Sequence, residues 1–300
     1  MEQRGFVFNG PDGDAELSIE QVRALAEQND PDGLYALGMA YLFGWDIDQD
    51  EAAGYDYLRK AVDAGQTEAM TLLVRLYMQG EYDGLDPERA ARYALAASKD
   101  GIPDAQLYAG LAYMDGISVK QDYKEAARLF RLAANQGNSE ARTNLAYLYQ
   151  EGLGVDRDEG KAFRLYRAAA NQGNLNAVFH LGVCYEFGVG TNVDMDKAKE
   201  QYRKGADQGD AFAMERLGYL YSNECGTPWA DEKESFEWFL KAAMEGVPTA
   251  MFTVGVSYLN GTGTEPSVEE ARKWLRMAST NGIEDAGYLL EQLGDAPKED

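Results

Sequence analysis

The chain has 300 residues, and its 28 Lys and Arg against 51 Asp and Glu give a formal net charge of −23 at pH 7. A surface with this much negative charge repels phosphate backbones and anionic lipid. Neither nucleic acid nor a membrane surface is therefore an expected ligand. The chain has one histidine, so neither a histidine-based catalytic triad nor a histidine metal cluster is expected.

Residues 1–16 are expected to form an N-terminal arm. The apolar run at 6–8 leads into Asn9-Gly10-Pro11-Asp12-Gly13, which has the composition of a turn, so the arm reads as a short extended or disordered piece. It has no apolar core of signal-peptide length, and no later stretch is long and apolar enough to span a bilayer. A cytoplasmic location is therefore expected.

Residues 141–173, ARTNLAYLYQEGLGVDRDEGKAFRLYRAAANQG, contain the unit on which the chain is built. Small and apolar residues at helical spacing predict a first helix that ends at Gly152, and Asp158 is a favourable N-cap for a second helix that ends at Gly173. Glutamate three residues after some caps, as in Asp122 and Glu125, also predicts capping boxes.

Three markers repeat this unit every 36 residues, with one extra residue in the sixth repeat. The tyrosines are Tyr41, Tyr77, Tyr113, Tyr149, Tyr185, Tyr221 and Tyr258, the caps are Asp50, Asp86, Asp122, Asp158, Asp194, Asp231 and Ser267, and the closing glycines run from Gly65 to Gly282. A helix pair of this length cannot bury its apolar face alone, so the repeats must stack. Glycines inside the first helices, such as Gly110 and Gly182, indicate close helix crossings.

The predicted fold is therefore an all-α solenoid of about seven helix-loop-helix repeats, in one domain over residues 17–294. The segment 17–28 has the pattern of a second helix without its first, and 286–293 that of a first helix without its second, so both are expected to cap the array. The polar residues 295–300 are expected to form a C-terminal tail.

The pattern A-x(3)-L-G-x(2)-Y-x(2)-G-x-G-V, followed by D-x(3)-A-x(3)-Y-x(2)-A-A-x(2)-G, resembles the Sel-one-like repeat family of tetratricopeptide-type α-solenoids. The match is carried by residues such as Ala177, Leu181, Gly182, Tyr185, Gly188, Gly190, Ala198 and Tyr202, and extends over about residues 33–290. The resemblance implies a right-handed superhelix, first helices that line a concave face, and an adaptor or scaffold role. The sixth repeat departs from the pattern at Glu224, Cys225 and Ser235, so its loop is expected to differ.

Candidate chemical sites all have simpler explanations. His180 is expected to be an ordinary helix residue, and the alternating Asp46, Asp48 and Asp50 lack the glycine and the glutamate of a calcium loop. Gly188-Val-Gly190 does not follow a strand and has no phosphate-loop lysine. Two cysteines do not make a disulfide framework, and reduced thiols are expected. We expect no cofactor, no metal and no enzymatic activity.

A second apolar stripe runs along the first helices, opposite the core stripe. Counted from the repeated alanine, it occupies offsets −1, 2, 6 and 9 at 100° per residue. The predicted binding residues on it are Tyr35, Met39, Leu42, Met78, Leu107, Leu111, Met114, Tyr147, Phe179 and Tyr219, and Val183, Phe252, Val256 and Leu259 continue the stripe. Either neighbouring first helices bury these residues against each other, or they line a groove for a ligand.

The function predicted from these observations is that of a scaffold or adaptor that binds a protein or peptide segment in a concave groove. The net charge favours a basic or neutral segment as the partner. A toxin-neutralising or regulatory inhibitor that acts through its surface is the alternative, and an enzyme is the least favoured class.

Overall fold

The computed structural model describes residues 6–10 and 13–294. The predicted tail at 295–300 lies outside the described residues, as do residues 1–5 and 11–12 of the predicted arm. Within the described part of the arm, strands β1 (Phe6–Gly10) and β2 (Gly13–Leu17) pair antiparallel, with Phe6 opposite Leu17. The extended arm is thus a two-stranded ribbon, a pairing that the sequence did not predict.

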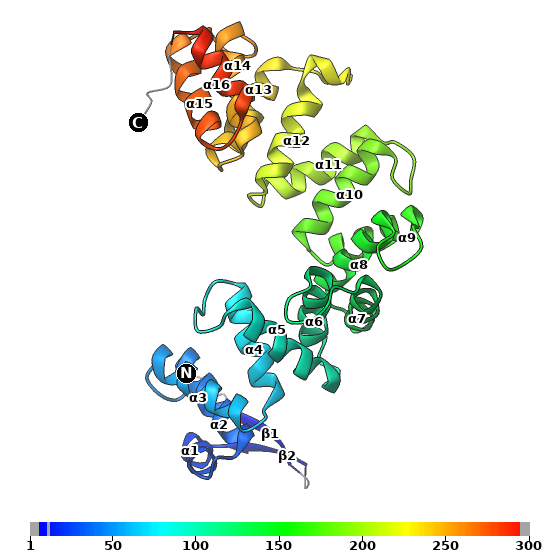
Figure 1. The fold of residues 1–300 in the computed structure, drawn as a ribbon. Helices are drawn as coiled ribbons and strands as arrows, with labels where there is room; N and C mark the ends of the chain where they lie inside the picture. Colours follow the sequence, from blue (N-terminus) through cyan, green and yellow to red (C-terminus); the bar gives the residue numbers. More distant parts are fainter. Residues whose placement is uncertain (1–5, 11–12, 295–300) are drawn as a thin grey trace. The chain divides into compact units, whose positions relative to one another are not determined.

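Sixteen α-helices make up most of the described chain (Figure 1). They are α1 (Ile19–Glu27), α2 (Pro31–Phe43), α3 (Glu51–Asp63), α4 (Thr67–Met78), α5 (Pro87–Ala97), α6 (Pro103–Asp115), α7 (Tyr123–Asn135), α8 (Ser139–Glu151), α9 (Glu159–Ala170), α10 (Leu175–Phe187), α11 (Met195–Ala206), α12 (Ala211–Tyr221), α13 (Glu232–Met244), α14 (Pro248–Asn260), α15 (Val268–Thr280) and α16 (Glu284–Gln292). The even-numbered helices α2–α14 are the seven predicted first helices, and the odd-numbered helices α3–α15 are their partners. The flanking helices α1 and α16 lie outside the seven repeats, and their role as caps of the array stays a prediction.

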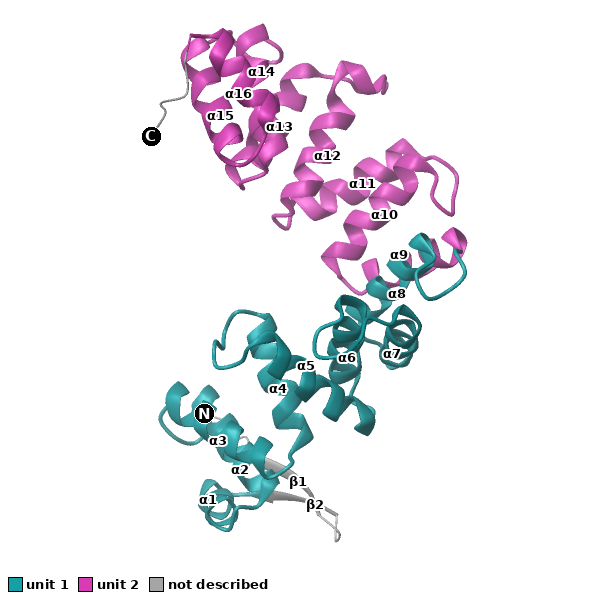
Figure 2. Cartoon of the chain, in the orientation of Figure 1, with its two compact units in different colours: residues 1–157 teal, residues 158–300 magenta. Residues whose placement is uncertain are grey.

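The chain divides into two compact units, residues 1–157 with α1–α8 and residues 158–300 with α9–α16 (Figure 2). Within each unit every helix packs against the next helix along the chain. In the first unit α4 also contacts α6, the first helix of the following repeat. Stacking of neighbouring repeats therefore forms the interior of each unit.

Small residues allow the two helices of one repeat to approach closely. A Cβ added to Gly110 would lie 2.5 Å from the Phe130 ring, and one added to Gly182 would lie 2.6 Å from the Tyr202 ring. Such distances are too short for carbon atoms, so α6 meets α7, and α10 meets α11, with an aromatic ring in the space of the missing side chain. The close crossings predicted from these glycines are confirmed.

The predicted N-caps of the second helices are also confirmed. Each cap side chain, from Asp50 to Ser267, accepts a backbone N–H of its own helix. The capping boxes predicted after these caps are wrong, because the glutamates bind elsewhere: Glu125 pairs with Arg128, Nη2 to Oε1 at 2.6 Å, and Glu270 pairs with Lys273 at 2.6 Å. An arginine or lysine one turn further along the helix competes successfully for these carboxylates.

A second glycine in several repeat loops lies against the start of the preceding second helix. Gly190 has φ +67°, and a Cβ there would lie 2.1 Å from the Glu159 carbonyl oxygen, while a Cβ on Gly263 would lie 2.0 Å from that of Glu232. The same contact is made by Gly154 on Tyr123. In these three repeats the second glycine of G-x-G therefore lets the loop lie directly on the neighbouring repeat.

The sixth repeat lacks this contact. Helix α12 ends two residues early, at Tyr221, and continues into a 3-10 turn, η2 (Asn223–Cys225). Gly226 retains a left-handed φ of +67°, but nothing lies within 4 Å of the position of its Cβ. The departure predicted for this loop is confirmed.

Candidate functional site

The ten predicted binding residues all lie on first helices, and they differ in exposure. Met78, Tyr147 and Tyr219 are exposed, at 54, 40 and 40%, respectively. Five others are half-buried: Tyr35, Met39, Leu111, Met114 and Phe179. Eight of the ten side chains are thus at least partly accessible.

Leu42 and Leu107 are buried, at 6 and 1% exposed, and their assignment as binding residues is corrected here. Leu42 packs against Gly54 of its own repeat, where a Cβ would lie 2.6 Å from Leu42 Cγ. Leu107 stands on α6, which contacts α4 as well as its sequence neighbours. Both side chains therefore stabilise the stack and are not available to a partner.

The position six residues after the repeated alanine is the accessible centre of this surface. It is occupied by Met39, Arg75, Leu111, Tyr147, Val183, Tyr219 and Val256, none of which is buried. The position four residues earlier is less accessible, since Thr71, Leu107 and Thr143 there are buried and its residues in the other four repeats are half-buried. We call the surface centred on these seven residues the first-helix face; each of the two units has its own part of it.

The first-helix face of the second unit contains a hollow of about 230 Å³ between α12, α13 and α14. Its apolar walls include Tyr219, Phe239, Phe252 and Val256. The Tyr219 ring stands edge-on to Phe239, with centroids 4.9 Å apart and an interplanar angle of 90°. This contact fixes the orientation of an exposed aromatic ring at the wall of the hollow.

A second cluster of aromatic rings lies in the same unit, where α10 meets α12. Phe179, His180 and Phe212 line a hollow of about 240 Å³ there, and Phe212 is 61% exposed. The sequence analysis missed Phe212, although it occupies the position before the repeated alanine, which belongs to the stripe. It also missed Phe187 on α10 and Arg216 on α12, which flank the stripe and meet each other only when these adjacent repeats pack.

An ion pair between a buried carboxylate and a half-buried arginine joins α10 to α12 beside this face. Glu186 is 8% exposed and accepts a hydrogen bond of 2.6 Å from the Tyr202 hydroxyl and one of 3.2 Å from Arg216 Nε, and it also pairs with Arg216 Nη2. The Arg216 guanidinium lies 5.4 Å from the Phe187 ring centroid and 5.3 Å from that of Tyr219. Burial and the bond to Glu186 raise the pKa of Tyr202, which keeps its hydroxyl protonated as a donor.

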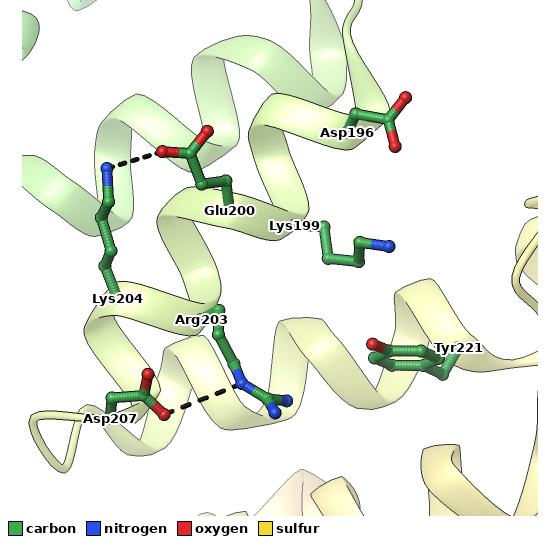
Figure 3. A pocket seen from close by; sticks show the side chains of 7 residues that line it. All are labelled: Asp196, Lys199, Glu200, Arg203, Lys204, Asp207 and Tyr221. Carbon is green, nitrogen blue, oxygen red and sulfur yellow. Dashed lines mark hydrogen bonds and ion pairs between the residues drawn. The ribbon is translucent and has the colours of Figure 1, made fainter.

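A charged hollow of about 360 Å³ on the second helix α11 offers a contrast (Figure 3). Its charges cancel, because it is lined by three acidic and three basic side chains together with Tyr221. Figure 3 shows Lys204 paired with Glu200 at 2.8 Å and Arg203 with Asp207 at 3.7 Å, while Lys199 extends towards Tyr221. The Lys199 ammonium also lies 3.7 Å from the Trp229 ring centroid. These cations are engaged by the protein itself, so this hollow is the weaker binding candidate.

Other kinds of site find no support in the described part of the chain. Those residues contain no group of three metal-ligating side chains of the His, Cys, Asp or Glu type. None of their helices is both long and apolar enough to cross a membrane. Cys184 and Cys225 are free thiols, and burial raises the pKa of Cys184 to about 12, which makes it a poor nucleophile.

His180 is half-buried and stacks on Tyr166, with ring centroids 4.9 Å apart. Burial lowers its pKa below the ordinary value near 6.5, and Asp210 partly opposes that shift. As the pH falls, the unfolded chain binds the proton first, so we expect stability to be lost from about pH 6.5 towards the pKa of the folded state. Urea titrations at pH 7.5 and 5.5 should show a larger loss for the parent than for His180→Phe. An equal loss in both proteins would contradict this account.

The repeated helix pairs define the class of protein, a helical-repeat solenoid. Seven consecutive segments match the Sel1 repeat, at residues 31–66, 67–102, 103–138, 139–174, 175–210, 211–247 and 248–283. The chain therefore belongs to the Sel1 repeat family, and the predicted fold class of about seven repeats of 36 residues is confirmed. The right-handed sense of the superhelix and the domain limits of 17–294 stay predictions.

Two solved structures share this fold. One is c5321, described as a protective antigen of uropathogenic Escherichia coli with an SLR fold, at 28% identity and a TM-score of 0.70 over 92% of this chain. The other is a Sel1 repeat protein from Oxalobacter formigenes, at 26% identity and a TM-score of 0.54 over 93% of this chain and 91% of that one. The chain spans 60% of the length of c5321.

A sequence relative covers much less of the chain. The yeast chitin synthase regulator SKT5, from Saccharomyces cerevisiae, is 45% identical over 51 residues, which make up 17% of this chain and 7% of the yeast protein. A match of this extent corresponds to little more than one repeat.

Proposed function

We propose that this protein is a non-catalytic interaction scaffold that binds a segment of a partner protein along its first-helix face. The observation that carries the proposal is the exposure of Met78, Tyr147 and Tyr219 on that face, where a solenoid that met only water would carry polar residues. Large aromatic and methionine side chains are enriched where protein surfaces bind partners. Methionine also adapts its shape to different ligands.

The family supports the general part of this proposal. Sel1 repeat proteins generally mediate protein–protein interaction and are typically non-catalytic. The aligned yeast protein is named as a regulator of chitin synthase. For this chain, the segment-binding groove is our own extension of those general properties.

The charge of the chain favours a basic or neutral partner. With a net charge of −23, the surface attracts lysine and arginine and repels nucleic acid and anionic membranes. Glu215 lies on the first-helix face of the second unit, half-buried beside Tyr219, and it raises the pKa of the Tyr219 phenol, although by less than burial does. An acidic group therefore lies beside an aromatic anchor on the proposed surface.

The test uses variants matched in exposure. Tyr147→Ala removes a 40% exposed ring from the first helix α8, and Leu132→Ala removes a 38% exposed side chain from the second helix α7 of the same unit. Partner proteins would be captured from the native cell, identified by mass spectrometry, and their dissociation constants remeasured with each variant. We expect Tyr147→Ala to weaken binding about thirtyfold, which corresponds to about 2 kcal/mol for a true anchor, and Leu132→Ala to leave it unchanged.

Melting temperatures separate binding from self-packing. If Tyr147→Ala lowers the melting temperature and leaves the dissociation constant unchanged, the exposed stripe serves the solenoid itself and the proposal fails. A loss of binding without a loss of stability supports it.

A further inference from the structure

We propose that the hollow between α12, α13 and α14 binds an arginine side chain of the partner. This deepens the proposed function and rests on it, because it names the residue type that one part of the first-helix face selects. It concerns the second unit alone.

The walls of the hollow suit a flat cation. Tyr219 is 40% exposed, with its ring held edge-on to Phe239, and Phe236 is held edge-on to Tyr258, with centroids 5.2 Å apart. Aromatic faces attract cations, and the planar guanidinium of arginine stacks on them better than the ammonium of lysine. Fixed rings bind with a smaller loss of side-chain entropy than mobile ones.

The charges of the hollow are acidic. Glu224 and Glu232 line it, and none of the described residues that line it is Lys, Arg or His. A backbone N–H, that of Asn223, donates to Glu232 Oε1 at 2.8 Å, which orients this carboxylate. Arg216 lies on the Tyr219 ring, but it is paired with the buried Glu186, so its charge is neutralised. A ligand that brings a positive charge is therefore favoured over a neutral or acidic one.

The hollow arises from the irregular part of the sixth repeat. Helix α12 ends at Tyr221, and the turn η2 places Glu224 where the repeat pattern has the glycine that ends a first helix, as at Gly188 of the preceding repeat. The sixth repeat thus gives up a favourable helix end and the loop contact made by its neighbours. Residues that do not favour the stability of their own repeat are expected at positions that serve binding.

The experiment uses the full chain and two small probes. N-acetyl-arginine methylamide carries the proposed side chain, and N-acetyl-citrulline methylamide is its neutral counterpart of nearly equal shape. Methyl NMR of Val256, which lines the hollow, reports binding of either probe. We expect the arginine probe to bind with a dissociation constant on the order of 1 mM, and the citrulline probe at least about tenfold more weakly because it carries no charge.

Variants of Glu224 and Glu232 test whether the two carboxylates cause the preference for the arginine probe. Glu224→Gln combined with Glu232→Gln keeps side-chain shape and an acceptor for the Asn223 N–H, and should reduce binding of the arginine probe to the level of citrulline. Glu269→Gln combined with Glu284→Gln, on the exposed surfaces of α15 and α16, makes the same change of charge outside the hollow and should leave binding unchanged. Equal binding of the two probes, no shift of Val256, or unchanged binding in the double variant of Glu224 and Glu232 would each overturn the proposal. Tyr147 does not line this hollow, so the partner measurements with Tyr147→Ala test the proposed function independently. If the arginine proposal fails, those measurements still decide whether the chain is a scaffold.

Discussion

Replacing Glu186 by leucine is expected to lower the free energy of unfolding by about 3 to 5 kcal/mol. The substitution leaves the buried Tyr202 hydroxyl without its acceptor and the Arg216 guanidinium, whose side chain is 26% exposed, without its partner. A buried charge or donor that loses its partner carries the full cost of desolvation. Urea titration followed by circular dichroism measures the loss, which we expect near the lower limit because Arg216 can turn partly into solvent.

A compensated variant is the control for this prediction. Glu186→Leu combined with Tyr202→Phe and Arg216→Met removes all three polar partners together, and buried ion pairs replaced by apolar groups often cost little. We therefore expect the triple variant to recover most of the stability that the single variant loses. If the triple variant is as unstable as the single one, the apolar fit of these side chains, and not the ion pair, determines the stability of this contact.

Leu145→Ala is expected to cost about 2 to 5 kcal/mol, because it removes a side chain that is only 4% exposed from α8. Leu293→Ala, at the end of α16, should cost much less, since no helix follows α16 among the described residues and water can reach the half-buried Leu293. Denaturant midpoints of the two variants give the comparison. Equal losses would show that the end of the array is packed as tightly as α8.

The repeat period predicted the helices well because it combines several independent local signals. Asp158 and Gly173 mark the start and the end of the same helix by different chemistry, one by accepting a backbone N–H and the other by a left-handed φ of +85°. Each repeat adds a further observation of the same pattern. The pairing of β1 with β2 was not predicted, because the arm occurs once and has no second copy with which to compare it.

The binding surface was predicted less completely, because a helical projection considers each helix by itself. It placed Leu42 and Leu107 on the outer stripe, yet packing against Gly54 in one case and stacking of α6 in the other bury them. It also could not bring Phe187 and Arg216 together, since they belong to different repeats. The angle and distance between adjacent helices decide these cases, and no residue pattern within one helix contains them.

The loop between α12 and α13, in the sixth repeat, is a place where the chain can gain a residue without disturbing its helices. The base of this loop is closed by the Asp231 N–H to the Tyr221 carbonyl oxygen at 2.8 Å, as the Asp194 N–H to the Tyr185 carbonyl closes the regular loop before it. Because the base is closed in the same way, the extra residue lies outside the helices and does not change their register. Nothing lies within 4 Å of the Cβ position of Gly226, whereas Gly190 and Gly263 lie against the backbone of Glu159 and Glu232. An insertion beside either of those two glycines would break this contact. The loop can therefore change in length beside Gly226 while α12 and α13 keep their places, whereas Glu224 and the buried Thr227, whose hydroxyl donates to the Leu220 carbonyl at 2.8 Å, are held by their roles.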